Sequence, residues 1–356
     1  MGKYQNVGTP KFYVDYFQYA LTTGLAKNEG IGGDNIFGED DNDGTKLFNG
    51  QNIQDLQKLF YLNPTNSLTI PEFSDTNRQL TIKTYLSEED YNINYIMTLG
   101  HNFNQSETTL YAEQYDGGYQ SITNTGLVNY EDTSTSNTYN GWSLTELGTG
   151  EYKDFLQLNI RNTNEPSTTN GDVKIGCISI GTSYTMPHSP DLDLTMTREF
   201  GGAKKQFTKG GALLTNYNYT HPPTWGDGEA WGLYTDAPTN LGARRAGRRV
   251  WDLKFSYLSA SDIMADMEML NLNADVDTSD YESYLGGGEG GNETYRFFSQ
   301  FMQKTLGGSL RFIFQPDGSD YNPDGFAICV LDQDSISIKQ VAHNTYNISL
   351  RIMEVW

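Results

Sequence analysis

Apolar and polar residues alternate at the end of the chain. The segment Asn344–Trp356 reads NTYNISLRIMEVW, and its apolar residues Ile348, Leu350, Ile352 and Val355 stand between polar ones. A period of two is typical of a strand that buries one face. Because a chain end usually frays unless it is held in a sheet, we expect this strand to close the last domain.

A second long strand is predicted in GRRVWDLKFSY, residues 247–257. Its alternation predicts that Val250, Leu253, Phe255 and Tyr257 point inward. Two long strands that bracket a module with helices indicate a building block rather than a catalytic cleft.

Shorter segments of the same kind recur along the chain and are separated by turn signals. We predict strands at Ser67–Ile70, Gln79–Leu86, Asn94–Phe103, Thr108–Tyr115, Asp154–Asn162 and Val173–Gly181, and again within 309–316, 326–332 and 335–343. A further strand, a Gly-rich turn and another strand are predicted within 192–220, whereas residues 34–50 are predicted to form a polar loop.

Helical periodicity is confined to three places. Residues 11–25 predict an extended piece followed by a short helix, and residues 1–33 therefore read as a docking arm. Ala260–Asn271 and Glu293–Leu306 have apolar residues on one helical face. The pattern changes at Met186–Pro190, so we predict an arm at 1–33 and domains at 34–190 and 191–356.

The composition supports a mainly β protein and excludes some partners. With 24 Tyr and 17 Phe among 356 residues, the chain is rich in strand-forming aromatics. Its net charge of −21 disfavours direct nucleic-acid recognition through phosphates. No segment approaches the roughly 20 apolar residues of a membrane helix, so we expect no membrane insertion and assembly in a cytoplasm.

The order of several short motifs resembles a known class of proteins. LGHNF at Leu99–Phe103 and IGCISIGTSYTMP at Ile175–Pro187 resemble a galactose-binding-like jelly roll found in structural proteins of tailed bacteriophages. REFGG at Arg198–Gly202, the strand at Gly247–Leu258 and SLRFIFQPD at Ser309–Asp317 then resemble distal tail, minor tail and tail-tube proteins. The resemblance implies an N-terminal jelly-roll β-sandwich followed by a tail-tube-like β-sandwich with one or two helices.

This resemblance implies a virion structural protein, assembled in the host cytoplasm, that scaffolds the tail tip. The expected partners are copies of itself in a ring of three or six and other phage tail proteins. Two alternatives stay open: a carbohydrate-binding adhesin module that contacts a host-surface glycan, and a tail-associated glycan hydrolase.

The motifs of common enzymes are missing from the sequence. No HExxH pair, GxSxG elbow or Walker loop occurs, and His101 in LGHNF is expected to hydrogen-bond neighbouring loops. We therefore predict no enzyme, no catalytic residue and no cofactor, although the many carboxylates leave a glycosidase pair open.

The clearest metal-like pattern is an incomplete calcium loop. Glu39, Asp41 and Asp43 occupy alternate positions ahead of Gly44. A calcium loop would then need an acidic residue six positions after this glycine, where the sequence has Gly50. A solvated acidic loop is favoured and no metal ligand is assigned. The resemblance allows a bound calcium ion, because such jelly rolls often carry one. Cys177 and Cys329 lack CxxC spacing and are expected to be buried thiols.

A basic cluster, two Trp residues of one segment and the Trp at position 356 are predicted to lie at an interface. The basic cluster, four arginines between positions 244 and 249, is interpreted as an inter-subunit salt-bridge surface, with a nucleic-acid patch as the alternative. The Trp residues in HPPTWGDGEAW are read as interface anchors, with a sugar-stacking platform as the alternative. The predicted interface residues are Arg244, Arg245, Arg248, Arg249, Trp225, Trp231 and Trp356.

Overall fold

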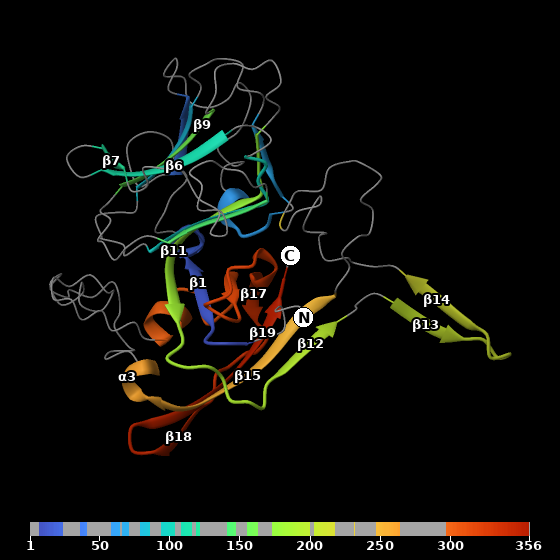
Figure 1. The fold of residues 1–356 in the computed structure, drawn as a ribbon. Helices are drawn as coiled ribbons and strands as arrows, with labels where there is room; N and C mark the ends of the chain where they lie inside the picture. The colour runs from blue at the N-terminus through green and yellow to red at the C-terminus, as the bar shows by residue number, and fades with distance from the viewer. Residues whose placement is uncertain are drawn as a thin grey trace.

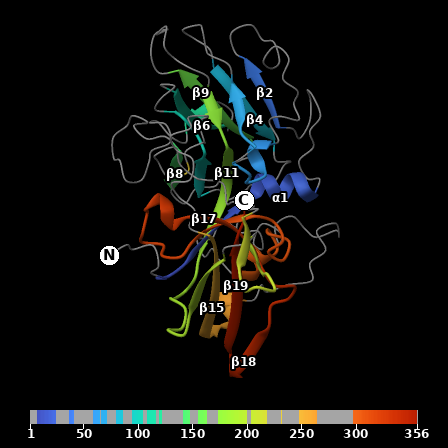
Figure 2. The same cartoon turned by 90° about the vertical axis from the view of Figure 1, so that its right-hand side faces the viewer.

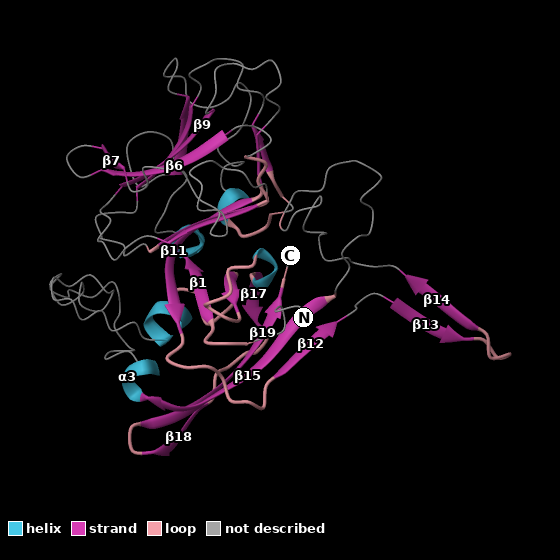
Figure 3. Ribbon diagram, viewed as in Figure 1, coloured by secondary structure: helices cyan, strands magenta, loops and turns pink. Residues whose placement is uncertain are grey.

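The structure is a computed structural model of the whole chain. It describes residues 7–23, 36–40, 58–64, 66–70, 79–85, 94–103, 108–115, 119–121, 141–146, 155–162, 173–199, 203–217, 231, 247–263 and 297–355. Within these ranges the fold is mainly β and is built around one large antiparallel sheet (Figure 3). The fold-class prediction is therefore confirmed.

The described strands run from the N-terminal arm to the end of the chain. They are β1 (Lys11–Asp15), β2 (Ile36–Asp40), β3 (Leu68–Ile70), β4 (Gln79–Tyr85), β5 (Tyr95–Leu99), β6 (Thr108–Tyr115), β7 (Tyr119–Ser121), β8 (Trp142–Glu146), β9 (Phe155–Asn162), β10 (Val173–Ile175), β11 (Cys177–Thr185), β12 (Thr195–Glu199), β13 (Ala203–Phe207), β14 (Leu213–Tyr217), β15 (Arg248–Ser259), β16 (Phe312–Gln315), β17 (Ala327–Leu331), β18 (Ile338–Ala342) and β19 (Thr345–Glu354).

The described helical segments are short. They are α1 (Tyr16–Thr23), the 3₁₀ turn η2 (Lys58–Phe60), α3 (Ala260–Ile263), the π-helical turn η4 (Phe297–Met302) and the 3₁₀ turn η5 (Pro323–Gly325). None of the described helices is long and apolar enough to cross a membrane.

Ten strands form one sheet that spans the molecule. Its order is β12-β15-β19-β17-β16-β1-β11-β5-β8, and β18 adds to β19 beside β17. A five-stranded sheet, β2-β4-β9-β6-β7, lies at the opposite end from β15 and β19 (Figures 1 and 2). Two pairs complete the fold: β10 with β3, and the hairpin of β13 and β14.

The N-terminal strand β1 lies in the middle of the large sheet. Along one edge it pairs antiparallel with β11, where Lys11 is opposite Thr185 and Asp15 is opposite Gly181. Along the other edge it pairs with β16, where Tyr13 is opposite Ile313. The backbones approach so closely at Gly181 that a Cβ there would collide with the carbonyl oxygen of Val14. The predicted arm is thus a central strand that connects the two halves of the sheet.

Polar side chains reinforce this connection. The Tyr13 hydroxyl donates to Gln315 Oε1 at 2.9 Å, and the Tyr321 hydroxyl donates to Glu146 Oε2 at 3.1 Å. Lys11 forms an ion pair with Glu146. These contacts join β1 to β8 and β16 as well as to the loop that carries Tyr321.

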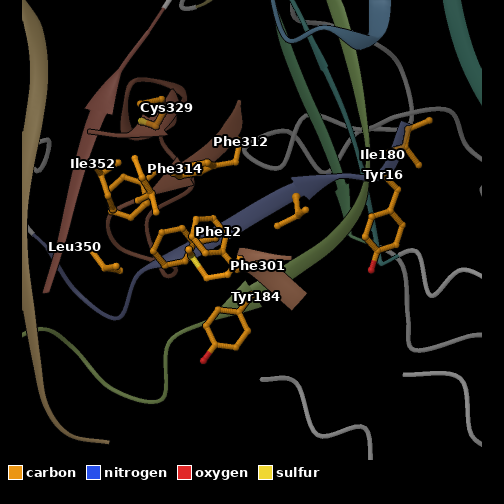
Figure 4. Packing of buried hydrophobic residues seen from close by; sticks show 14 of the residues in the cluster. Phe12, Tyr16, Ile180, Tyr184, Phe301, Phe312, Phe314, Cys329, Leu350 and Ile352 are labelled. Atoms are coloured by element: carbon orange, nitrogen blue, oxygen red, sulfur yellow. The ribbon is translucent and has the colours of Figure 1, made fainter. Parts of the chain in front are cut away.

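The main core lies on one face of the central strands and is rich in aromatic rings. Phe12 of β1 lies among Phe301, Phe312 and Phe314, with ring centroids 4.6, 5.8 and 5.2 Å away (Figure 4). All four rings are fully buried. Since Phe12 comes from the N-terminal arm and the other three from the C-terminal part, this core forms only when the ends of the sequence meet.

Most predicted strands appear within a few residues of their expected bounds. Ile348, Leu350 and Ile352 of β19 are buried, as are Val250 and Leu253 of β15. The two cysteines are buried free thiols, as expected. The predicted helices at 260–271 and 293–306 are described only as α3 and η4 and the turns after it, and their other residues lie outside the described ranges.

Two predictions were wrong. Tyr257 is 80% exposed rather than inward-facing, because a bulge between Phe255 and Leu258 shifts the register and buries Leu258 instead. The predicted polar loop at 34–50 contains the strand β2, which pairs with β4. In β2 the cross-strand pairing overrides the low strand propensity of Gly, Glu and Asp.

The large sheet bears on the domain organisation. It takes strands from all three predicted segments: β1 from 1–33, β5, β8 and β11 from 34–190, and the rest from 191–356. The boundaries at 33/34 and 190/191 stay predictions.

We predict that Phe12→Ala lowers the free energy of unfolding by about 3–5 kcal/mol, because it removes a ring from a closed aromatic core. Urea unfolding followed by fluorescence measures this loss. Tyr257→Ala is the control, since an aromatic ring is deleted at an exposed position and a change within about 0.5 kcal/mol is expected. Equal losses in the two variants would contradict the central role of Phe12.

A buried carboxyl group lies where β1 meets α1. Asp15 Oδ1 accepts hydrogen bonds from the N–H groups of Phe17 and Gln18, at 2.9 and 3.1 Å, and so caps the helix. Burial raises the pKa of Asp15 from 3.8 to about 7, even though these two hydrogen bonds lower it. The folded protein therefore holds a proton on Asp15 at pH values where the unfolded chain has lost it.

We predict that Asp15 makes the fold less stable as the pH rises from about 4 to about 7, by on the order of 4 kcal/mol in total. Asp15→Asn keeps an oxygen for both N–H groups but carries no charge, so its unfolding free energy should fall less over this range. The measurement is urea unfolding of both proteins at several pH values, with Asp334→Asn as a control at an exposed carboxylate. Parallel pH curves for wild type and Asp15→Asn would refute this role.

Candidate interaction surface

The hairpin of β13 and β14 projects away from the body of the protein (Figure 1). Its strands pair from Ala203 opposite Tyr217 to Phe207 opposite Leu213. The Lys209-Gly210-Gly211 turn reverses the chain, with Gly211 at φ 82°, and Thr208 N donates to Ala212 O at 2.9 Å. Alternating residues around a Gly-Gly turn explain why this segment folds locally as a ribbon.

Large apolar side chains on this hairpin face the solvent. The exposed fractions are 76% for Phe207, 51% for Leu213 and 57% for Leu214. Phe207 and Leu213 are cross-strand partners and share one face, whereas Leu214 is opposite Gln206 and lies on the other. The ribbon therefore presents apolar groups on both of its faces.

The strand β12 forms one end of the large sheet. Within the described residues it pairs only with β15, from Thr195 opposite Asp252 to Glu199 opposite Arg248. The chain ahead of it carries Leu192, whose side chain is fully exposed. This edge and the hairpin lie on the same side of the molecule in Figure 1.

Of the predicted basic cluster, the described residues Arg248 and Arg249 lie at the start of β15. The Arg249 side chain donates from Nε to Glu354 Oε2 at 3.0 Å and from Nη2 to Glu354 Oε1 at 2.8 Å. It also donates to the Phe326 carbonyl at 3.0 Å, and its guanidinium lies 5.3 Å from the Trp251 ring centroid. Both charged groups are largely buried.

This ion pair has a clear role within one chain. It joins Glu354, the last residue of β19, to Arg249 near the start of β15. Arg249 is also the cross-strand partner of Arg198 in β12. Burial and the neighbouring Arg249 lower the pKa of Arg198. Whether any of these arginines also contacts a neighbouring molecule stays a prediction, and Arg244 and Arg245 lie outside the described residues.

The Trp predictions have mixed outcomes. Trp231 is buried, with φ 61°, and its Nε1 donates to the Pro323 carbonyl at 2.8 Å. It therefore packs inside this chain and presents no open ring for a sugar. Trp225 and Trp356 lie outside the described residues, so their predicted interface roles are not tested.

His101 and its neighbour hold the end of β5, as the sequence predicted. The His101 carbonyl accepts from Gly141 N at 2.6 Å, and Asn102 exchanges hydrogen bonds with Lys174. Burial lowers the pKa of His101 from 6.5 to about 3, so its ring stays neutral near pH 7. His101 is stacked on Phe103, with ring centroids 4.3 Å apart.

The described residues hold no group of three or more His, Cys, Asp or Glu side chains arranged to bind a metal ion. Of the calcium-like pattern, Glu39 falls within β2, whereas Asp41, Asp43 and Gly50 lie outside the described ranges.

The sequence analysis did not identify the hairpin as a surface of interest. The available signal was the run FTKGGALL, in which apolar residues flank a Gly-Gly turn without any acidic neighbour. Sequence alone does not show whether such residues enter a core or face solvent.

Neither a protein-family model nor a curated protein sequence matches this chain. Among solved structures, it is similar to CBM32-1, a module of a family 31 glycoside hydrolase from Clostridium perfringens, with 9% identity and a TM-score of 0.26 over 38% of this chain and 87% of that one. It is also similar to the CBM32-4 module of CpGH89, produced by the same organism, with 11% identity and a TM-score of 0.26 over 44% of this chain and 98% of that one. At these values the similarity supports no inference about a ligand.

We predict that Glu354→Leu destabilises the fold by about 3–5 kcal/mol, because the Arg249 charge is left buried without its partner. The double variant Arg249→Met with Glu354→Leu should recover most of this loss, since no charge then remains to be compensated. Urea unfolding of the wild type, both single variants and the double variant completes a thermodynamic cycle. Additive losses in the double variant would show that the two side chains act independently.

Proposed function

We propose that this chain is a non-catalytic structural protein that functions by assembling with other proteins, as a ring-forming component of a phage tail. The observation that carries the proposal is the projecting hairpin with exposed Phe207, Leu213 and Leu214. The phage-tail assignment itself rests on the motif order in the sequence.

The physical argument begins with the hairpin in isolation. A two-stranded ribbon is at best marginally stable in water, because it has too few neighbours to cover its apolar side chains. Contiguous exposed apolar groups on a folded protein commonly mark a contact surface. Burying Phe207 and Leu213 against another protein would stabilise the complex by about 25 cal/mol for each Å² of apolar surface covered.

The body of the protein supports the same proposal. One sheet takes strands from the start, the middle and the end of the chain, and its aromatic core is fully buried. Such a body gives the β12 edge a rigid support, and rigid presentation lowers the entropic cost of binding.

Carbohydrate binding is the second candidate. The two solved structures named above are CBM32 modules, and the argument for this candidate rests on an exposed side chain of this chain itself. Tyr257 is a suitable aromatic group: it is 80% exposed, its φ is 64°, and its N–H donates to Asn347 Oδ1 at 3.1 Å. A rigid exposed ring of this kind can stack on a sugar. No observation among the described residues favours the glycan hydrolase.

We predict that the purified chain forms a discrete oligomer of three or six copies and that its melting temperature is unchanged by a panel of mono- and oligosaccharides. Light scattering at several protein concentrations gives the mass, and thermal melting with and without each sugar tests the second candidate. A stable monomer would overturn assembly by self-association. A sugar-dependent rise in melting temperature that Tyr257→Ala abolishes would establish carbohydrate binding instead.

A further inference from the structure

We infer that the hairpin of one copy docks along the β12 edge of a second copy of this chain. This inference rests on the proposed assembly function. It adds which two surfaces meet, and that the partner is a second copy of this chain. It uses two features already described, the apolar hairpin and the outer edge of β12, neither of which has a further strand partner among the described residues.

The charge of the hairpin identifies the kind of partner. Residues 203–217 contain Lys204, Lys205 and Lys209 and no Asp or Glu, so the segment carries +3. The rest of the chain has 21 Lys and Arg against 45 Asp and Glu, a net charge of −24. A cationic hairpin on a strongly anionic protein is complementary to other copies of the same protein, and opposite charges both steer the encounter and favour the correct partner.

The shape of the hairpin indicates how it is held. Apolar side chains lie on both faces, with Phe207 and Leu213 on one and Leu214 on the other. A contact on one face alone would leave the other exposed. Each strand of the hairpin also has one backbone edge without a strand partner among the described residues. A sheet edge that extends the ribbon, with side chains above and below it, satisfies all of these groups.

The β12 edge has matching chemistry. Its outer backbone groups face away from β15, Leu192 offers an exposed apolar side chain, and the exposed carboxylates of Asp193 and Glu199 flank it. Asp193 also lies 3.6 Å from Lys254 in a solvent-exposed ion pair, which is weak enough to be exchanged. The edge thus supplies hydrogen-bonding groups, an apolar contact and two carboxylates within one short segment, which also carries the positive charge of Arg198.

The described strands of one chain do not make this contact with each other. Among the described residues β12 pairs with β15 and β13 pairs with β14, and the hairpin projects away from the sheet in Figure 1. The donor and acceptor surfaces differ, so the contact is heterologous. Repetition of such a contact generates a closed ring when the rotation closes and an open filament when it does not.

A complementation experiment tests this directly. The donor variant Phe207→Asp with Leu213→Asp disables the hairpin, and the acceptor variant Leu192→Arg with Asp193→Lys disables the edge. Each full-length variant alone should associate more weakly than wild type by more than about tenfold, as for residues that dominate an interface. An equimolar mixture should form a 1:1 dimer and nothing larger, because it contains one working hairpin and one working edge. Light scattering measures all three samples.

The control is Val341→Asp, which places the same charge on another exposed apolar residue of the protein and should leave assembly unchanged. Melting curves show whether each variant remains folded, and no loss is expected because none of the five positions lies in the core. Association of the wild type should also weaken as salt is raised from about 0.05 to 0.5 M, since the contact pairs Lys with carboxylates.

The outcomes separate this inference from the proposed function. If both variants assemble like wild type, or if the mixture stays monomeric, the hairpin-to-edge contact is wrong while assembly through another surface stands. If the wild type is itself monomeric at every concentration, self-assembly and this contact both fail. A mixture that stops at the dimer supports the inference.

Discussion

The pairing of β1 with strands from both halves of the chain is the interaction on which the rest of the structure depends. Hydrogen bonds to β11 on one edge and β16 on the other make the large sheet continuous, and Phe12 carries the same connection into the core. Without this strand, β11 and β16 would each expose an unpaired edge, and the aromatic rings of the C-terminal part would lose their central neighbour. Stability and connectivity are thus set by five residues of the N-terminal arm.

The positions of strands were largely predictable, because a half-buried strand needs apolar and polar residues at alternate positions and this alternation is visible in the sequence. Strands β4, β6 and β19 illustrate this. The failures have a common cause in tertiary context. Tyr257 follows the alternation of β15, but the bulge between Phe255 and Leu258 reverses its direction. The strand β2 has little strand propensity and exists because β4 pairs with it. The central position of β1 could not be deduced, since its partners lie far away in sequence.

The candidate surface was harder to predict than the fold, for a physical reason. An apolar residue on a strand reads the same whether it enters a core or awaits a partner, so Phe207 and Leu213 carry no distinguishing mark in the sequence. The arginines show the reverse case. Arg249 was predicted as an interface residue from its charge, whereas its strongest described contacts are with Glu354 and the Phe326 carbonyl of the same chain. Charge and hydrophobicity identify candidates, and only the fold shows which of them are already occupied.

The position of β1 also has a consequence for biosynthesis. The ribosome synthesises β1 before the other described strands and β16 about 300 residues later. The edge of β1 that pairs with β16 therefore stays without this partner until residue 315 has been translated. During that time the hairpin of β13 and β14 has already emerged, while the core beneath Phe12 is still incomplete. Long-range pairing of this kind slows folding and exposes the nascent chain to aggregation. Translation that stops before residue 315 therefore yields a chain that carries the apolar hairpin segment on an unfinished body, which makes such fragments targets for chaperones and proteases.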